Sequence, residues 1–411
     1  MISFEKHRLK NNLTLITHKD ESTPMACVNI LYDVGARDED ENKTGFAHLF
    51  EHLMFGGSVN IPNYDNPLQL VGGENNAFTT NDITNYHLTL PANNLETAFW
   101  LESDRMLSLA FTEKSLEVQR GVVVEEFKQR YLNQPYGDVW LHLRPLSFTK
   151  HPYRWCTIGK EISHIENATL TDVKSFFSRF YNPSNAIMVV SGNINTDKVL
   201  KLAEKWFEPI PAGEKPKRNL PQEPVQTSAR NETLHRDVPA NALYKAYHMC
   251  SRHDAEYYAS DLISDVLSRG NSSRLYVELV KNQQLFSDIN AYITGDMDKG
   301  LFCISGNLAE GIKMEDAEKG IEVEINKIKS ELVGERELQK CKNKIEASLL
   351  FSETDILNKS TNLAISELLG DAEMVNQEGE KYQRVTPKDI RDTANKILRE
   401  ENCSTLYYLK K

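Results

Sequence analysis

The sequence predicts an α+β fold made of two homologous domains, each a largely antiparallel sheet packed with helices. Three observations lead to this expectation. The chain has 411 residues, too many for one ordinary core. Its two halves carry matching segments, and strand-like and helix-like stretches mix without strict alternation.

The matching segments lie near the end of each half. Thr169, Asp172 and Asn185 recur as the same residue types 217 positions later, and each copy leads into a strand-like run. In both copies the Thr can cap a helix whose third position is the Asp, which is a local pattern that any helix could use. Because the offset stays constant across 17 residues, duplication explains it better than coincidence.

A proline-rich stretch separates the halves. Between residues 207 and 236, five prolines lie among charged and polar residues with almost no apolar periodicity. This composition is typical of an extended linker. We therefore expect an N-terminal domain at residues 1–212, a linker at 213–232 and a C-terminal domain at 233–411.

Strands and helices can be assigned in the first half. Residues 13–17 and 26–32 alternate like antiparallel strands, with a hairpin-like turn at 19–24 between them. Long amphipathic helices are expected at 94–109 and 113–132. This order predicts helices layered over a sheet rather than a strictly alternating α/β fold.

Composition narrows the partners and the compartment. A net charge of -11 and a pI near 5.6 argue against a nucleic-acid or anionic-membrane partner. No apolar run approaches the roughly 20 residues that span a bilayer. No secretion signal is visible at the N-terminus, so the cytoplasm is the expected compartment and the periplasm the second choice. The six scattered cysteines have no C-x-x-C spacing and are expected to be reduced and mostly buried.

The segment at residues 45–52 carries the most chemical information. His48 and His52 are four residues apart, so on a helix their imidazoles share one face and can bind one metal ion. With Glu51 they form H-x-x-E-H, the inverted order of the H-E-x-x-H zinc protease motif. For either histidine alone, a hydrogen-bonded core histidine is the competing interpretation.

The surroundings of this motif support a buried helix. Asn42 or Thr44 can cap its start, and the pair Gly56 and Gly57 can end it. Apolar residues are expected to bury it on more than one side: Phe46, Leu49, Phe50 and Leu53. Polar side chains on a buried helix need partners, which favours a bound ion.

A catalytic zinc needs a third protein ligand and an open position. The best candidate segment is the acidic pair Glu125 and Glu126, which follows a Gly-Val-Val-Val run on an amphipathic helix. That pattern brings a carboxylate close to the core. A solvated acidic face remains the alternative for Glu125.

These motifs together resemble the M16 (pitrilysin/insulinase) zinc metallopeptidases. The length and two-half layout are similar to the M16B branch, which includes mitochondrial processing peptidase and bacterial homologues. The resemblance covers the whole chain, and it rests on these stretches: residues 45–55, Glu126 at 74 residues beyond His52, residues 73–79, 101–106 and 151–153.

The resemblance implies a set of site residues. His48, His52 and Glu126 would bind Zn2+, and Glu51 would be the general base that activates a zinc-bound water. In the family the second glutamate of the acidic pair is the ligand, so Glu126 is preferred to Glu125.

The resemblance also implies a mode of substrate binding. The family's N-A-F-T strand corresponds to Asn76, Ala77 and Phe78, which would bind a peptide by adding it to an exposed strand edge. This mode suits short or unfolded polypeptides. For these residues read alone, an ordinary strand or turn is the competing interpretation.

The chain departs from the family pattern at three places. Gln119 stands where the family usually has a glutamate that supports the metal site, and a neutral amide can still hydrogen-bond a ligand. Val280 and Ser287 stand where the second half of the family carries Arg and Tyr, which grip substrate and stabilise the reacting carbonyl. Asp261 and Asp265 align with His48 and His52, so the second copy of the motif has lost its histidines.

These features predict a zinc-dependent metalloendopeptidase that is the metal-bearing subunit of a dimer. A second M16B subunit supplying Arg and Tyr is the preferred partner, and a homodimer is the alternative. The competing function is a non-catalytic M16-like assembly or binding subunit. Such subunits usually have degraded metal motifs, whereas the motif here is complete. A different metal-assisted hydrolase on the same scaffold is a third interpretation.

Overall fold

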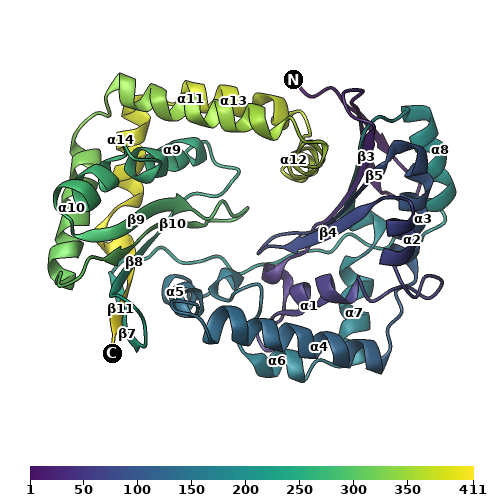
Figure 1. The fold of residues 1–411 in the computed structure, drawn as a ribbon, viewed down its shortest axis with the longest axis horizontal. Helices are drawn as coiled ribbons and strands as arrows, with labels where there is room; N and C mark the ends of the chain where they lie inside the picture. Colours follow the sequence, from purple (N-terminus) through teal and green to yellow (C-terminus); the bar gives the residue numbers. More distant parts are fainter. The chain divides into compact units, whose positions relative to one another are not determined.

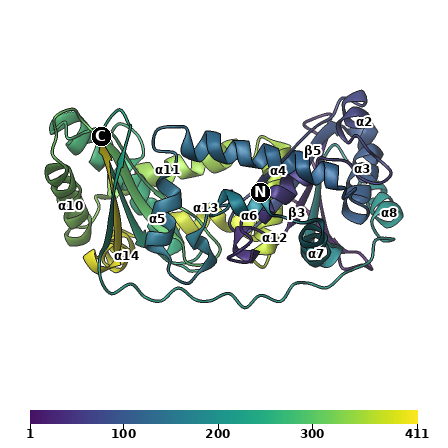
Figure 2. The same cartoon turned by 90° about the horizontal axis from the view of Figure 1, so that it is seen from below.

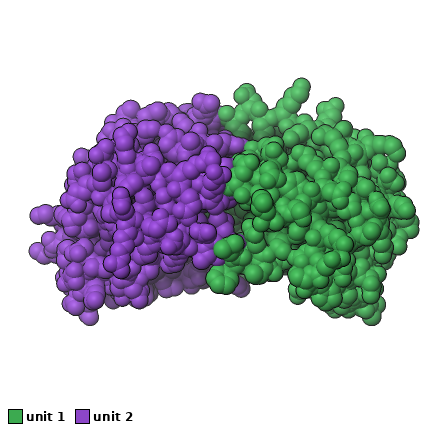
Figure 3. Space-filling model, turned by 90° about the horizontal axis from the view of Figure 1, so that it is seen from above, with its two compact units in different colours: residues 1–128, 155–220, 350–377 green, residues 129–154, 221–349, 378–411 purple.

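The structure is a computed structural model that describes residues 1–411 as two compact units. Figure 3 colours the units separately. Unit 1 comprises residues 1–128, 155–220 and 350–377, and unit 2 comprises residues 129–154, 221–349 and 378–411. Each unit therefore contains one segment from the other half of the sequence. No helix is both long enough and apolar enough to cross a membrane.

Unit 1 is built on a six-stranded sheet in the order β1-β2-β6-β3-β5-β4. Strands β3, β5 and β4 of this sheet are labelled in Figure 1. Only β2 and β6 run parallel, and the other four pairings are antiparallel. The strands are β1 (Glu5–Arg8), β2 (Thr14–Lys19), β3 (Met25–Tyr32), β4 (Glu74–Thr79), β5 (Thr84–Pro91) and β6 (Ala186–Gly192). The terminal position of β4 leaves one of its edges without a neighbouring strand.

Unit 2 is built on a five-stranded sheet in the order β7-β11-β8-β10-β9. The strands are β7 (Arg230–Arg236), β8 (Ala242–His248), β9 (Phe286–Ile293), β10 (Leu301–Leu308) and β11 (Cys403–Lys410). This order repeats β2-β6-β3-β5-β4, and again only the first pair is parallel. The predicted α+β fold, with a largely antiparallel sheet and packed helices in each half, is therefore confirmed.

Helices cover both faces of the unit 1 sheet. Strands β3 and β6 pack against α12 (Ile356–Leu368), which comes from the second half of the sequence. The contact includes a hydrogen bond between the hydroxyls of Ser360 and Ser191 and one from Thr361 to Asn29. The remaining helices of this unit are α1 (Phe46–Leu53), α2 (Asp65–Leu70), α3 (Leu95–Leu107), α4 (Glu113–Phe127), α6 (Ile162–Glu166), α7 (Leu170–Phe180) and α8 (Thr196–Trp206).

Unit 2 also has helices on both faces of its sheet, and here the helix from the other half of the sequence comes from the first half. One face of its sheet packs against α5 (Val139–Ser147), which comes from the first half of the sequence. The other face carries the larger apolar core. The remaining helices are α9 (Tyr257–Ser268), α10 (Met314–Ser330) and α14 (Pro387–Ile397), while α11 (Glu335–Ser352) and α13 (Met374–Arg384) each contain residues of both units.

The repeated sequence pattern has the same local structure in both copies. Thr169 and Thr386 each accept a hydrogen bond from the backbone N–H of the Asp three residues later, and so cap α7 and α14. Asn185 and Asn402 are buried, and each donates to the carbonyl five residues before it and to one further carbonyl. The amide thereby joins the end of each helix to the following strand.

Two local expectations need correction. Residues 19–24 do not close a hairpin, because β6 inserts between β2 and β3 and pairs with both. The stretch after α8 has no helix or strand over residues 211–229 (Figure 2), but β7 begins at Arg230. The last part of the expected linker is thus a strand, stabilised by parallel pairing with β11. The long helices expected at 94–109 and 113–132 correspond to α3 and α4.

Candidate metal centre

Helix α1 carries the H-x-x-E-H motif and is buried by its apolar residues. Phe46, Leu49, Phe50 and Leu53 are each at most 5% exposed, as expected. The helix begins at Gly45, whose φ of 86° is left-handed, and a Cβ there would lie 2.7 Å from the Ile158 carbonyl oxygen. Only glycine fits this position without strain.

The cap expected from Asn42 or Thr44 is wrong, because neither side chain caps α1. Thr44 instead contacts His164 through its hydroxyl. The buried carboxylate of Glu39 takes the capping role, and it accepts hydrogen bonds from the backbone N–H groups of Gly45 and Ala47, both at 2.8 Å. Burial raises the pKa of Glu39 well above its usual range, although these two hydrogen bonds oppose the shift. The helix dipole also stabilises a negative charge at this end of the helix.

Glu126 reaches the motif from α4, which packs against α1. The side chain of Glu126 is 17% exposed and faces the two histidines. The side chain of Glu125 is 61% exposed and pairs with Lys128 at 2.7 Å. Of the acidic pair, the structure therefore brings Glu126, and not Glu125, to the motif.

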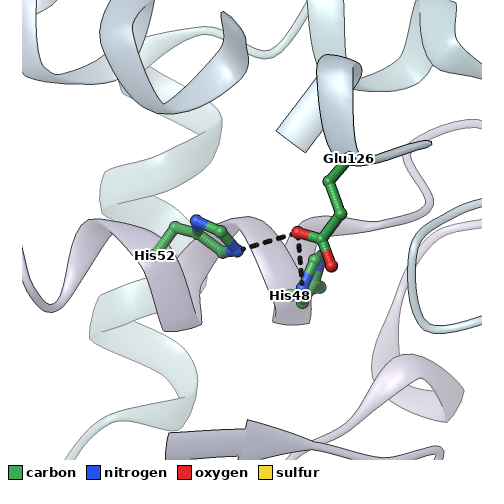
Figure 4. A group of neighbouring side chains, drawn as sticks. All are labelled: His48, His52 and Glu126. Atoms are coloured by element: carbon green, nitrogen blue, oxygen red, sulfur yellow. Dashed lines mark ion pairs between the residues drawn. The ribbon is translucent and has the colours of Figure 1, made fainter. Parts of the chain in front are cut away.

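The three side chains converge on one point (Figure 4). Glu126 Oε2 lies 3.6 Å from His48 Nε2 and 3.3 Å from His52 Nε2, and the three candidate ligand atoms all lie within 4.8 Å of one another. Ligands at 2.0–2.2 Å in a tetrahedron around zinc are about 3.4 Å apart, so two of the observed separations match that geometry. The chain contains no other group of three His, Cys, Asp or Glu residues placed to hold a metal ion.

The competing interpretation, hydrogen-bonded core histidines, fits these distances less well. Neutral N–H···O hydrogen bonds have heavy-atom distances of about 2.7–3.2 Å, and both observed distances are longer. The side chains are also partly accessible, with exposed fractions of 13% for His48 and 23% for His52. Partial access suits a site that admits an ion and a substrate.

Glu51 lies on α1 between the histidines, and a residue of the sheet forms a hydrogen bond with its carboxylate. Its carboxylate oxygen Oε2 accepts a hydrogen bond from the hydroxyl of Thr79 at 2.5 Å. Thr79 is the last residue of β4, which packs against α1. A carboxylate in this place is available for proton transfer beside the three candidate ligands.

Asn76, Ala77 and Phe78 lie on β4, the edge strand of the unit 1 sheet. Asn76 is exposed, and Ala77 and Phe78 are half-buried. The backbone N–H of Ala77 donates to the side-chain oxygen of Asn76 at 2.8 Å. An edge strand of this kind can accept an added strand.

Gln119 lies on α4 two helical turns before Glu126, which places it on the same face of the helix. Its side chain is half-buried. A supporting role for this amide stays a prediction.

The counterpart of the motif in unit 2 lies on α9. Asp261 accepts a hydrogen bond from the Tyr382 hydroxyl at 2.6 Å, and Asp265 pairs with Arg269 at 3.1 Å. Burial raises the pKa of Asp261, and it raises that of Asp265 to about 6. Tyrosine and arginine partners thus satisfy these two carboxylates.

Val280 and Ser287 also lie in unit 2. Val280 is in a π-helical turn (Tyr276–Asn282) and packs against the apolar core. Ser287 is on β9 and donates to the Asn307 carbonyl oxygen at 3.2 Å. Neither side chain offers a cation or a phenol.

Two functional candidates were missed from the sequence. Glu39 precedes α1 by seven residues, outside the spacing of a capping box, so no local pattern marks it. Thr79 belongs to the N-A-F-T stretch, but its contact with Glu51 depends on β4 lying against α1. Only the alternation of side chains along β4 could have indicated a shared face for Thr79 and Ala77.

The sequence is similar to those of known proteins. Residues 14–139 match the family model described as insulinase (peptidase family M16), and residues 167–345 match the model described as peptidase M16 inactive domain. The zinc protease PqqE of Helicobacter pylori is 30% identical over 412 residues, covering 98% of this chain and 92% of that protein.

Two further relatives cover nearly the whole chain. The mitochondrial-processing peptidase subunit beta of Saccharomyces cerevisiae is 24% identical, covering 96% of this chain and 86% of that protein. The crystal structure of a protease from Helicobacter pylori superposes with a TM-score of 0.92 at 29% identity, covering 99% of this chain and all of that one.

Proposed function

The chain belongs to the M16 peptidase family, and from that premise we propose that it is a zinc-dependent endopeptidase acting on short or unfolded polypeptides. One observation carries the proposal. Glu126 lies at distances from His48 and His52 that match zinc ligands, and Glu51, on the helix that carries both histidines, accepts a hydrogen bond from the last residue of the edge strand β4. The names of several relatives as zinc proteases support the choice of metal.

The three ligands would leave one tetrahedral position open. His48 and His52 would bind through Nε2 and Glu126 through Oε2, with Glu39 fixing the start of the helix that carries both histidines. When bound, the ion acts as a Lewis acid that acidifies water and polarises a carbonyl group. The proton transfers fall to the chain's own residues.

Glu51 is the residue suited to those transfers. As a carboxylate it can accept a proton from the attacking water and pass it to the departing amine. Its hydrogen bond from Thr79 holds one of its oxygen atoms in a defined position. A positioned acid–base group of this kind contributes about 10²–10⁴-fold to the rate.

The substrate would bind along β4. A peptide paired with the free edge of this strand, along Asn76, Ala77 and Phe78, would run past the hydroxyl that holds Glu51. Backbone pairing requires an extended chain, which is why short or unfolded polypeptides suit the site and folded proteins do not.

The substitution Glu51→Gln tests the proposed function. The variant should retain one zinc per chain, measured by elemental analysis, while peptide cleavage falls by about 10³-fold or more. Glu125→Gln on the exposed face of α4 is the matched control and should leave both quantities unchanged.

Two results would contradict the proposal. Cleavage by Glu51→Gln at the original rate would show that Glu51 is not the general base. A purified chain that takes up no zinc when zinc is supplied would instead favour the alternative, a non-catalytic assembly or binding subunit.

We also propose that the chain works as the metal-bearing subunit of a dimer, preferably with a second M16B-like subunit. This proposal rests on two residues: Val280 and Ser287 supply neither a cation nor a phenol where the family carries Arg and Tyr. The similarity to a protein named as a subunit of mitochondrial-processing peptidase supports it. A homodimer is the other arrangement.

The missing groups can be restored to test this. The double variant Val280→Arg with Ser287→Tyr should raise kcat/KM of the isolated chain at least about tenfold, since a single stabilising donor is worth 10²–10³ in comparable sites. Replacing both residues with Ala is the control and should give no gain. Full activity of the unsubstituted chain, undiminished by dilution, would contradict the dimer proposal.

A further inference from the structure

A hydrogen bond joins the candidate metal centre of unit 1 to its edge strand β4. The hydroxyl of Thr79 donates to Glu51 Oε2 at 2.5 Å, and it links the last residue of edge strand β4 to the helix that carries both histidines. The bond is partly buried, so water competes with it only in part. Hydrogen bonds to an ionised carboxylate are about twice as strong as neutral ones.

The position of Thr79 in the sheet explains why its hydroxyl faces α1. Side chains alternate along a strand, so Ala77 and Thr79 share one face of β4. Thr79 lies opposite Thr84 of β5, which is fully buried and donates to the Val34 carbonyl oxygen at 2.9 Å. The donor therefore stands at a well-anchored point of the sheet.

The two partners differ in stiffness. Threonine is branched at Cβ and has few χ1 options, whereas glutamate has three rotatable bonds. A stiff donor therefore selects one orientation of a flexible acceptor. Small misplacement of a catalytic group can cost about 10²-fold in rate.

We propose that Thr79 is a positioning residue that fixes the Glu51 carboxylate relative to the peptide-binding edge of β4. This inference rests on the proposed function, because it assigns Glu51 as the base and β4 as the substrate strand. Thr79 touches neither the metal ligands nor the reacting atoms in this account. It acts only through Glu51, and it links the peptide-binding edge of β4 to the carboxylate that accepts the proton.

The same pair of strands offers a matched control. At the opposite end of β4, the hydroxyl of Thr89 on β5 donates to Glu74 Oε1 at 3.2 Å. This is also a threonine–glutamate hydrogen bond between neighbouring elements, but it is exposed and does not involve α1. Its removal should affect strand pairing alone.

The first experiment measures kcat, KM and zinc content for Thr79→Val, Thr79→Ser and Thr89→Val in the full-length chain. Thr79→Val should keep one zinc per chain and a KM within about twofold, while kcat falls about 10–100-fold. Thr79→Ser, which keeps the hydroxyl, should recover most of kcat. Thr89→Val should behave like the unsubstituted chain.

Three results would overturn the inference. An unchanged kcat in Thr79→Val would show that the hydroxyl does not position the base. Loss of zinc in that variant would show that Thr79 acts on the metal site. Failure of Thr79→Ser to recover kcat would show that the methyl group, and not the hydroxyl, matters.

A second measurement needs neither activity nor metal. Thr79→Val should lower the midpoint of thermal unfolding of the metal-free chain by about 1–4 °C, and should have no such effect in a Glu51→Ala background. Equal shifts in both backgrounds would overturn the inference. If the unsubstituted chain cleaves no peptide, the proposed function fails, and this coupling still decides whether Thr79 holds Glu51.

Discussion

Helices α1 and α9 occupy equivalent places in the two units but present different chemistry. On α1, His48 and His52 meet Glu126 at distances that suit a zinc ion. On α9, Asp261 and Asp265 stand in the same places and are satisfied by Tyr382 and Arg269. The strand order of the two sheets is the same apart from the additional strand β1.

The difference separates what the fold needs from what the site needs. Both units keep the capped helix, the buried asparagine and the parallel strand pair, because these serve the sheet and its packing. The metal ligands are not needed for the fold. In unit 2 a phenol and a guanidinium offset the cost of removing the carboxylates of Asp261 and Asp265 from water.

The largest expected effect comes from removing a candidate ligand. His52→Ala should lose the zinc and reduce peptide cleavage by at least about 10³-fold, because two ligands do not hold a catalytic zinc. Asp265→Ala, at the equivalent position of unit 2, should retain one zinc per chain. Elemental analysis and a peptide cleavage assay measure both. Zinc loss in the Asp265 variant would contradict the assignment of the metal to unit 1.

A smaller effect is expected from the anchors at the starts of the two helices. Glu39→Ala leaves two backbone N–H groups of α1 without their carboxylate and should cost about 2 kcal/mol in the free energy of unfolding. Zinc affinity should fall about tenfold as well, since groups that orient ligands commonly matter by that factor.

The matched change at the start of α9 is Glu256→Ala. Glu256 pairs with Lys396 in an exposed ion pair, and such pairs contribute little to stability. No resolvable change in unfolding is expected. Chemical denaturation of the metal-free variants measures the free energy of unfolding in both cases. Equal losses in the two variants would show that Glu39 contributes no more to stability than the exposed Glu256.

The smallest effect concerns pH. Burial raises the pKa of Asp265 from its ordinary value of 3.8 to about 6. A raised folded-state pKa means that this group stabilises the fold below pH 4, and that this contribution is lost as pH rises through 6. Asp265→Asn should therefore become more stable relative to the unsubstituted chain by about 1–2 kcal/mol between pH 4 and pH 7. A difference that does not vary with pH would contradict this.

The sequence could predict those features that depend on local spacing. The four-residue separation of His48 and His52 on a helix is local, and so is the repeated capping pattern of Thr169 and Thr386. Glu126 followed from its position on an amphipathic helix together with the family resemblance. The edge strand containing Asn76 was expected from the family resemblance.

Features that depend on distant segments could not be predicted. The insertion of β6 between β2 and β3 brings in residues more than 150 positions away, and the hairpin expectation failed for that reason. The exchange of α5 and α12 between the units follows no local signal. Glu39 and Thr79 became visible only once α1 was seen against its neighbours.

A zinc titration of the metal-free chain tests the central claim most directly. Binding followed by calorimetry should saturate at one zinc per chain, should be absent in His52→Ala, and should be unchanged in Asp265→Ala. Saturation at two ions, or tight binding retained by His52→Ala, would contradict an account in which unit 1 alone carries the metal centre.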